Sequence, residues 1–274
     1  MSTWGGQQEQ QGYEGQDGAP SRRKRRSRKG EERPLAAPTP PPPADTRAER
    51  VLYIGCEGES TEPDYLNYLN ERFGDGSRTG QQRFRIQPVY AKNGLTPAKV
   101  VAAVREKARE DEAWALFDRD QHHDIPQALK EAAEDATEVC FSHPSFDLWL
   151  LLHFQAFGGG QSGSSKTVVE KLRQADLAFG NFDKRNDKSV EGDRRKALEN
   201  RETTAVSHAK SLVSQCEHGS CKANLAKTRA FERGNARKSS AAWAARSGHA
   251  ADCPVLSRDP STDVWRLLVS LGIA

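Results

Sequence analysis

Apolar residues after position 50 follow two alternating patterns along the chain. Short apolar runs with strand character alternate with segments in which apolar residues recur at helical spacing. The runs cover residues 51–56, 84–91, 113–117 and 137–141. Because strands that alternate with helices favour a parallel sheet covered on both faces, the pattern predicts an α/β fold with a mostly parallel central sheet.

The helical segments begin at recognisable signals. Thr61 is a candidate N-cap with Pro63 in the first turn, and Thr96-Pro97 begins the next helix. A nearly all-apolar helix follows Ser142–Ser145, and such a helix is normally buried. Further helices are predicted at residues 126–136, 167–177, 201–215, 224–230 and 264–271.

The composition divides the chain into three parts. Residues 1–48 are polar and rich in Gly, Gln and Pro, with a basic run, and cannot bury enough apolar surface to fold. We therefore expect a disordered, basic, Pro-rich tail. Residues 49–157 are the predicted α/β core, and residues 158–274 are a mainly helical C-terminal region that packs on it.

The basic bias of the chain lies in the tail. Residues 1–50 contain ten Lys and Arg against seven Asp and Glu, and the remaining residues contain 31 of each kind. Such a tail is suited to electrostatic contact with nucleic acid, or it is a solubilising arm. Both interpretations stay open.

The sequence predicts a cytoplasmic protein without a membrane partner. No apolar run is long enough to span a bilayer, and the N-terminus lacks a signal-peptide pattern. The five cysteines are an odd number and are not spaced like a disulfide framework, which fits a reducing compartment.

Three carboxylates follow predicted strands. Glu57 comes after the first strand beside a glycine, and Asp118 and Asp120 come after the third. The carboxyl ends of strands are where open α/β sheets build their sites, and clustered carboxylates are unfavourable without a cation. We therefore predict that Glu57, Asp118 and Asp120 hold Mg²⁺ or Mn²⁺ and are catalytic. The Asp-x-Asp taken alone also fits a simple helix or turn cap.

Four more residues are candidates for a supporting or substrate-binding role. They are Glu62, Lys92, His122 and Asp147. Each has an ordinary alternative: Glu62 and Asp147 as favourable charges at helix starts, and the other two as solvated surface side chains.

A group of Cys and His residues raises the question of zinc. Cys216, His218 and Cys221 lie close together in the sequence, and His208, His249 and Cys253 accompany them in residues 208–253. Their spacing matches no common zinc motif well, which favours free thiols. Zinc binding by this group is left open.

Three segments together resemble a known family. They are Ile54-Gly55-Cys56-Glu57-Gly58-Glu59-Ser60-Thr61-Glu62-Pro63, Phe117-Asp118-Arg119-Asp120, and His143-Pro144-Ser145-Phe146-Asp147 with the apolar helix up to Phe154. Pro260-Ser261-Thr262-Asp263-Val264 is similar as well. The strand-end Glu and the later Asp-x-Asp resemble the Toprim pattern. The closer resemblance is to the RloB family of bacterial phage-defence and restriction-associated proteins.

The resemblance implies a Toprim-like core over roughly residues 50–270. Relatives with such a core are metal-dependent nucleases, some of them silenced by an ABC/SMC-type ATPase. Because the chain has no Walker A motif, that ATPase would be a separate protein. A homodimer is one candidate assembly. The family usually has Asn and Glu where this chain has His143 and Asp147, which leaves the role of that turn open.

We expect a Mg²⁺-dependent nuclease effector of an anti-phage, abortive-infection system that hydrolyses phosphodiester bonds of RNA, tRNA or DNA. The alternative is a non-catalytic component of a defence complex that binds nucleic acid or a partner. An enzyme needs Glu57 and Asp118, whereas a binding component tolerates their loss.

Overall fold

The computed structural model describes residues 49–78, 81–120, 122–160, 164–218, 220–221 and 246–274. These residues belong to one compact unit, Thr46–Ala274. The predicted tail of residues 1–48 and the predicted helix 224–230 lie outside the described residues. No helix in the described ranges combines the length and the apolar character that crossing a bilayer requires.

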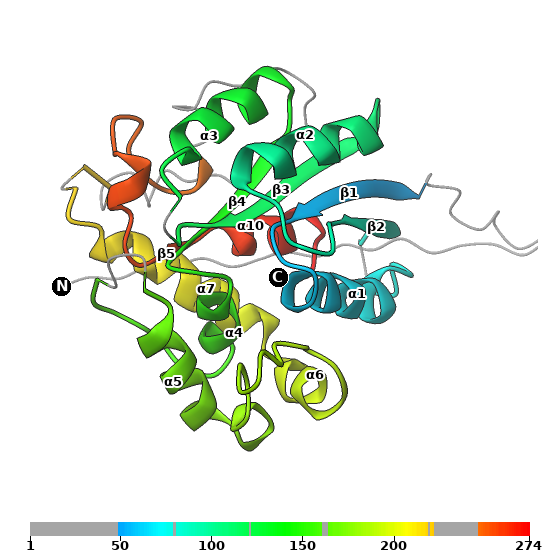
Figure 1. Cartoon of the computed structure of the whole chain (residues 1–274). Coiled ribbons are helices and arrows are strands. Elements are labelled where there is room, and N and C mark those ends of the chain that lie inside the picture. Colours follow the sequence, from blue (N-terminus) through cyan, green and yellow to red (C-terminus); the bar gives the residue numbers. More distant parts are fainter. Residues whose placement is uncertain (1–48, 79–80, 121, 161–163, 219, 222–245) are drawn as a thin grey trace, which may run out of the picture. The chain divides into compact units, whose positions relative to one another are not determined.

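A five-stranded, mostly parallel sheet lies at the centre (Figure 1). Its strands, in spatial order, are β2 (Phe84–Val89), β1 (Arg50–Cys56), β3 (Glu112–Asp118), β4 (Glu138–His143) and β5 (Ser261–Thr262). All four predicted strands are confirmed, and they pair in parallel. β5 pairs antiparallel with β4 and was not predicted. The predicted α/β class is therefore confirmed.

Alternate side chains of the strands enter two separate cores. In β3, Trp114 and Leu116 belong to one core, and Ala113, Ala115 and Phe117 belong to the other. Because side chains along a strand alternate between the two faces of a sheet, each face has its own apolar layer. Both layers are covered by helices, as the nearly continuous apolar runs predicted.

Two helices cover one face. They are α2 (Pro97–Ala108) and α3 (Ile125–Glu134), which lie above the sheet in Figure 1. α2 approaches β1 so closely that a Cβ on Gly55 would lie 2.8 Å from Val100 Cγ1. Glycine at this position therefore permits the contact between helix and strand.

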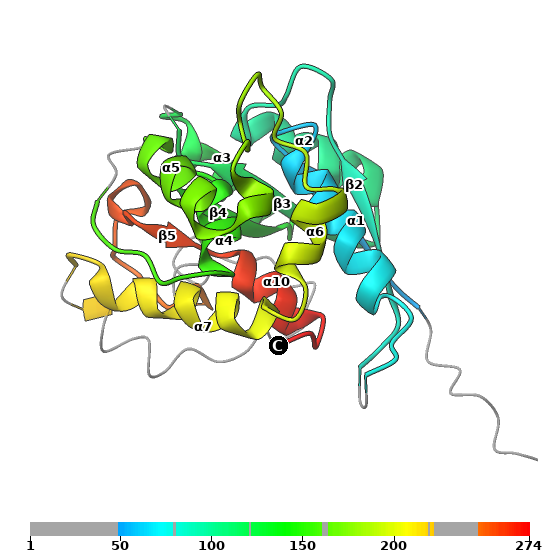
Figure 2. The ribbon, with the colours of Figure 1, turned by 90° about the horizontal axis from the view of Figure 1, so that it is seen from below.

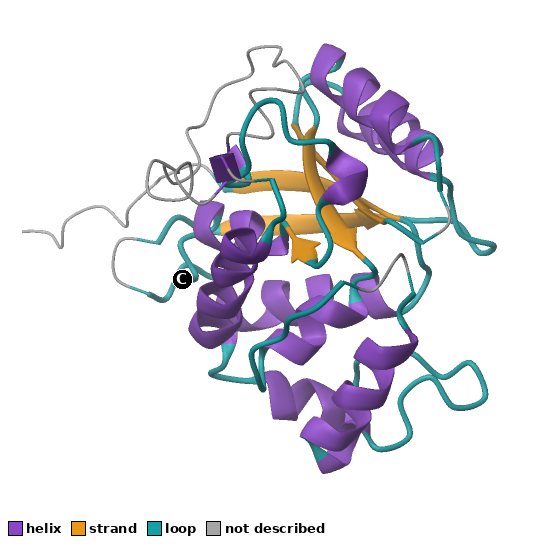
Figure 3. Cartoon of the chain, turned by 90° about the vertical axis from the view of Figure 1, so that its left-hand side faces the viewer, coloured by secondary structure: helices purple, strands orange, loops and turns teal. Residues whose placement is uncertain are grey.

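The opposite face is covered by helices from both halves of the chain, seen from below in Figure 2. They are α1 (Thr61–Phe73), α4 (Asp147–Leu152), α7 (Glu202–Leu212) and α10 (Val264–Ser270). α5 (Lys166–Ala175) packs against α4, and α6 (Gly192–Leu198) follows it. Short 3₁₀ turns lie at Leu177–Phe179, Val213–Gln215 and Val255–Ser257. Helices thus flank both sides of the strands (Figure 3).

The residues expected to begin helices were predicted less accurately than the helices and strands themselves, which follow from the apolar periodicity. Ser60 is the N-cap position of α1, and Thr61, expected there, is the first helical residue. The Thr61 hydroxyl instead donates to the carbonyl oxygen of Lys188 at 2.9 Å. A distant segment therefore uses the side chain that the sequence assigned to capping.

A buried ion pair fastens α10 to the sheet. The guanidinium of Arg266 donates to Glu138 at 2.7 Å and to the carbonyl oxygen of Val139 at 2.8 Å. Arg246 also pairs with Glu138. Because a buried charge without partners is costly, these contacts fix the last helix on β4.

Candidate functional site

A pocket of about 720 Å³ opens where the carboxyl ends of β1, β3 and β4 meet. Seven of its lining residues are acidic, and two are lysines: Glu57, Glu59, Glu62, Asp118, Asp120, Asp147 and Asp183, with Lys99 and Lys188. The pocket is therefore polar and carries an excess of negative charge. Open α/β sheets place their ligand sites at this edge.

Glu57 lies at the end of β1 and is held by two donors. Its Oε2 accepts from the backbone N–H of Asp118 at 3.0 Å, and its Oε1 lies 2.9 Å from His122 Nε2. Burial raises the pKa of Glu57, and the Asp118 amide and His122 oppose that shift. The first and third strands are thus linked through this carboxylate, and His122 belongs to the same pocket.

Asp118 ends β3, and Asp120 follows in a turn. Burial raises the pKa of Asp118 well above its usual value, and the neighbouring carboxylates of Glu62, Glu57 and Asp120 add to the effect. Asp120 is exposed and has a φ of +28°. Its backbone N–H donates to the carbonyl oxygen of Pro144 at 3.3 Å, which joins the loops after β3 and β4. The three predicted catalytic carboxylates therefore line one pocket.

Glu62 is buried in the first turn of α1 and lines the pocket. Its Oε1 accepts from the backbone N–H of Gly58 at 3.2 Å, and a Cβ on Gly58 would lie 2.6 Å from Oε2. Burial raises the pKa of Glu62 to about 7, and the carboxylates of Asp147 and Glu57 add to the shift. Glycine at position 58 thus leaves room for the carboxylate of Glu62 close to Glu57.

Asp147 is also buried, and it begins α4. Its Oδ2 accepts from Lys188 Nζ at 3.1 Å and from Ser145 Oγ at 3.4 Å. Burial raises the pKa of Asp147, while the Lys188 ammonium opposes the shift. Burial lowers the pKa of Lys188, but Asp147 together with Asp183 and Asp118 outweighs this, and the pKa is raised. Lys188 is thus a charged lysine held at the pocket wall.

The loop that carries Lys188 is fixed by α1. Besides the bond from Thr61, the backbone N–H of Val190 donates to Asp64 Oδ2 at 2.8 Å. Because this loop comes from the C-terminal half, no strand pattern marks it, and sequence reasoning missed Lys188, Lys99 and Asp183. Lys92, the basic residue predicted for the pocket, is exposed in the turn after β2 and is not among its lining residues.

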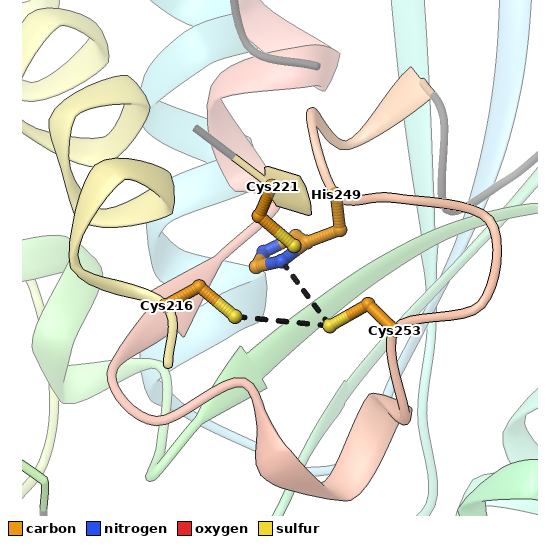
Figure 4. Close-up of side chains that lie close together, drawn as sticks. All are labelled: Cys216, Cys221, His249 and Cys253. Carbon is orange, nitrogen blue, oxygen red and sulfur yellow. Dashed lines mark hydrogen bonds between the residues drawn. The ribbon is translucent and has the colours of Figure 1, made fainter. Parts of the chain in front are cut away.

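The pocket offers oxygen donors of the kind that Mg²⁺ prefers. The carboxylates are nevertheless spread around it, and Glu57 is engaged by N–H donors. Within the described ranges, one group of three or more ligand-type residues has all its ligand atoms within 4.8 Å of one another. It consists of Cys216, Cys221, His249 and Cys253, which is a soft donor set typical of Zn²⁺ rather than Mg²⁺ (Figure 4).

Comparison with protein families shows which family the chain belongs to. The family model described as RloB-like protein matches residues 52–271, so the chain belongs to the RloB-like family. A search of curated proteins found no match, and neither did a search of solved structures. The match spans both the strands that build the pocket and the segment that carries the Cys and His group.

Proposed function

We propose that this member of the RloB-like family is a divalent-metal-dependent nuclease whose active site is the acidic pocket. The observation that carries the proposal is the convergence of Glu57, Asp118 and Asp147 from three strand ends, with Lys188 beside them. Acids that would hold a metal ion and lysines that would contact phosphate are the parts that phosphodiester hydrolysis needs.

The residues fit Mg²⁺ or Mn²⁺ in the chemistry of their donors. Glu57, Asp118 and Asp120 would hold the ion, since all are oxygen ligands at the open edge of the sheet. When bound, the ion would shield phosphate charge and lower the pKa of a coordinated water. Its charge would also offset the repulsion from neighbouring carboxylates, which adds to burial in raising the pKa of Asp118.

The side chains around these acids supply the other functions. The ammonium groups of Lys188 and Lys99 would bind phosphate oxygens, and Asp147 keeps Lys188 in place and charged. The Glu57–His122 pair, joined at 2.9 Å, would accept a proton from the attacking water. Glu62 lines the pocket and would support Glu57 by accepting the hydrogen bond from the Gly58 N–H.

Family membership supports a role in anti-phage defence through abortive infection. We propose that the substrate is RNA, tRNA or DNA, and that a separate ABC/SMC-type ATPase controls the enzyme. Such control fits an enzyme whose unrestrained activity would harm its own cell. A homodimer is the candidate assembly for the nuclease itself.

The test is a cleavage assay with the full chain, supercoiled DNA and total tRNA, with Mg²⁺, Mn²⁺ or EDTA. Asp118→Asn removes a charge but keeps the shape of the side chain, and it should abolish metal-dependent cleavage. The matched control is Asp111→Asn, the same change at an exposed residue just before the opposite end of β3. This variant should cleave like the wild type.

Two results would contradict the proposal. One is wild-type cleavage that persists in EDTA, and the other is full cleavage by Asp118→Asn. If the protein binds nucleic acid without cleaving it, and Asp118→Asn binds equally well, the chain is a binding component of a defence complex. The Asp118 amide and His122, which engage both carboxylate oxygens of Glu57, are the feature that would explain that result.

A further inference from the structure

A second constellation of reactive side chains lies away from the acidic pocket. Cys216 follows the 3₁₀ turn after α7, and Cys221 comes shortly after it. His249 and Cys253 precede the 3₁₀ turn at Val255–Ser257. We call these four residues the Cys3His cluster. Figure 4 shows that the four side chains point toward one another from different segments of the chain.

The distances within the cluster fit a tetrahedral ion. Cys216 Sγ lies 3.7 Å from Cys253 Sγ, and Cys253 Sγ lies 3.8 Å from His249 Nδ1. Ligands at Zn–S distances of about 2.3 Å in a tetrahedron are separated by about 3.8 Å. All four ligand atoms lie within 4.8 Å of one another. The three thiols are free, so no disulfide explains their approach.

The four residues of the cluster are enclosed by the protein. All four residues are buried. Among the residues that the structure describes, the three cysteines form a small core with Val213 and Ala250, apart from the two large cores of the sheet. The backbone N–H of Ala250 donates to Cys221 Sγ at 3.3 Å. Such N–H donors commonly orient and stabilise thiolate ligands.

The charge near the cluster also fits a metal site. Three thiolates and one Zn²⁺ leave one net negative charge. The guanidinium of Arg258 is buried beside the cluster and donates to the carbonyl oxygen of Cys253 at 3.0 Å. A buried cation at this place offsets that charge.

We infer that the Cys3His cluster is a structural zinc site. It supplies four protein ligands and leaves no open position for substrate, which distinguishes structural from catalytic zinc. The spacing is Cys-x₄-Cys and His-x₃-Cys, with 27 residues between the two pairs. Sequence reasoning did not favour zinc because the long separation hid the pairing that the fold creates.

The position of the site defines what the ion would do. It would join the end of α7 to the segment that leads into β5, the strand that pairs with β4. It would also close the ends of the 27-residue stretch, in which seven residues are Lys or Arg and one is Glu. The zinc would therefore fix the two ends of a basic segment of the chain relative to each other.

Metal analysis of the full chain, purified under reducing conditions without added metal, tests the inference. We expect about one zinc per chain, released by a thiol-specific mercurial. Replacement of the ion by Co²⁺ should give the intense visible bands of a tetrahedral site and a sulfur-to-cobalt charge-transfer band. Cys216→Ser and His249→Ala should each reduce the zinc content at least tenfold.

Neighbouring histidines provide matched controls. His208 was grouped with the cluster by sequence, but its Nδ1 donates to the carbonyl oxygen of Leu152 at 2.8 Å. His218 is partly exposed, and its Nδ1 lies 3.9 Å from Cys221 Sγ. His208→Ala and His218→Ala should keep their zinc. His249→Cys restores a fourth ligand and should also keep zinc, which separates loss of a ligand from loss of folding.

Three outcomes would overturn the inference. They are wild-type protein that has no zinc and binds no Co²⁺, zinc retained by both Cys216→Ser and His249→Ala, and a Cys216–Cys253 disulfide in place of the metal in the reduced preparation. The metal measurement needs no nuclease activity. It therefore succeeds or fails independently of the proposed function.

Discussion

The acidic pocket and the Cys3His cluster are two opposite ways of bringing reactive side chains together. In the pocket, hard oxygen donors at strand ends face an open cavity, and their like charges are partly balanced by lysines and N–H donors. In the cluster, soft donors from irregular segments lie buried at tetrahedral spacing. The first arrangement suits exchangeable ligands and substrate, and the second suits an ion that stays bound.

A variant that disables only the pocket should separate the two regions with the largest effect. Glu57→Gln keeps an acceptor for the Asp118 amide but removes the charge beside His122. We expect cleavage to fall at least 1,000-fold, equivalent to about 4 kcal/mol in the barrier. Zinc content, measured on the same preparation, should not change. Glu110→Gln, at an exposed site, is the control, and loss of zinc in Glu57→Gln would contradict the separation of the two regions.

The reverse experiment disables only the cluster. Cys253→Ala should lower the free energy of unfolding by about 3 kcal/mol, since loss of a bound metal is among the largest single-residue effects. Limited proteolysis should show earlier cleavage between residues 213 and 258. Cys140→Ala, a buried cysteine in β4 outside the cluster, should cost only about 1 kcal/mol. Equal costs for both variants would argue against a metal in the cluster.

The burial of Glu62, to which repulsion from Asp147 and Glu57 adds, should appear in the pH dependence of stability. The pKa of Glu62 rises from 4.5 to about 7 in the folded protein. The folded state therefore binds the extra proton between these values, and stability falls as the pH rises through that range. Glu62→Gln should match the wild type near pH 4.5 and exceed it at pH 8 by about 3 kcal/mol in metal-free buffer. Denaturant unfolding at both pH values measures this difference in the free energy of unfolding, with Glu106→Gln as control. A variant that is more stable than the wild type at pH 4.5 alone would contradict the prediction.

The smallest effect is expected on nucleic-acid binding, when Lys188 and Lys92 are replaced in turn. Lys188→Gln should weaken nucleic-acid binding about tenfold. It should also reduce the slope of the logarithm of the binding constant against the logarithm of the salt concentration by about one. Lys92→Gln, in the exposed turn after β2, should change binding much less. Fluorescence anisotropy at several salt concentrations measures both variants. The opposite ranking would favour the position that the sequence suggested.

Regular structure explains which features the sequence could predict. The four parallel strands follow from their apolar runs, and Glu57, Asp118 and Asp120 share a pocket because each follows such a strand. β5 has two residues, too few for any periodicity. Lys188 reaches the pocket only through the bonds that α1 makes with its loop.

The Cys3His cluster also shows what the sequence could not predict. Its residue types were visible in the sequence, but its ligands come from segments without periodicity, 27 residues apart. The approach of such segments depends on the finished fold. Neither motif spacing nor apolar pattern contains that information.

The ion pair between Arg266 and Glu138 sets an order of events during synthesis. Arg266 contacts Val139 across 127 positions of the chain, and a nascent protein leaves the ribosome from its N-terminus. Until residues 261–270 emerge, β4 has an unpaired edge and Glu138 lacks this cation. We therefore expect the unit to remain incompletely folded for most of its translation. Ribosome-bound chains that end before residue 260 should be cleaved by proteases within β4, whereas chains that expose residue 270 should resist.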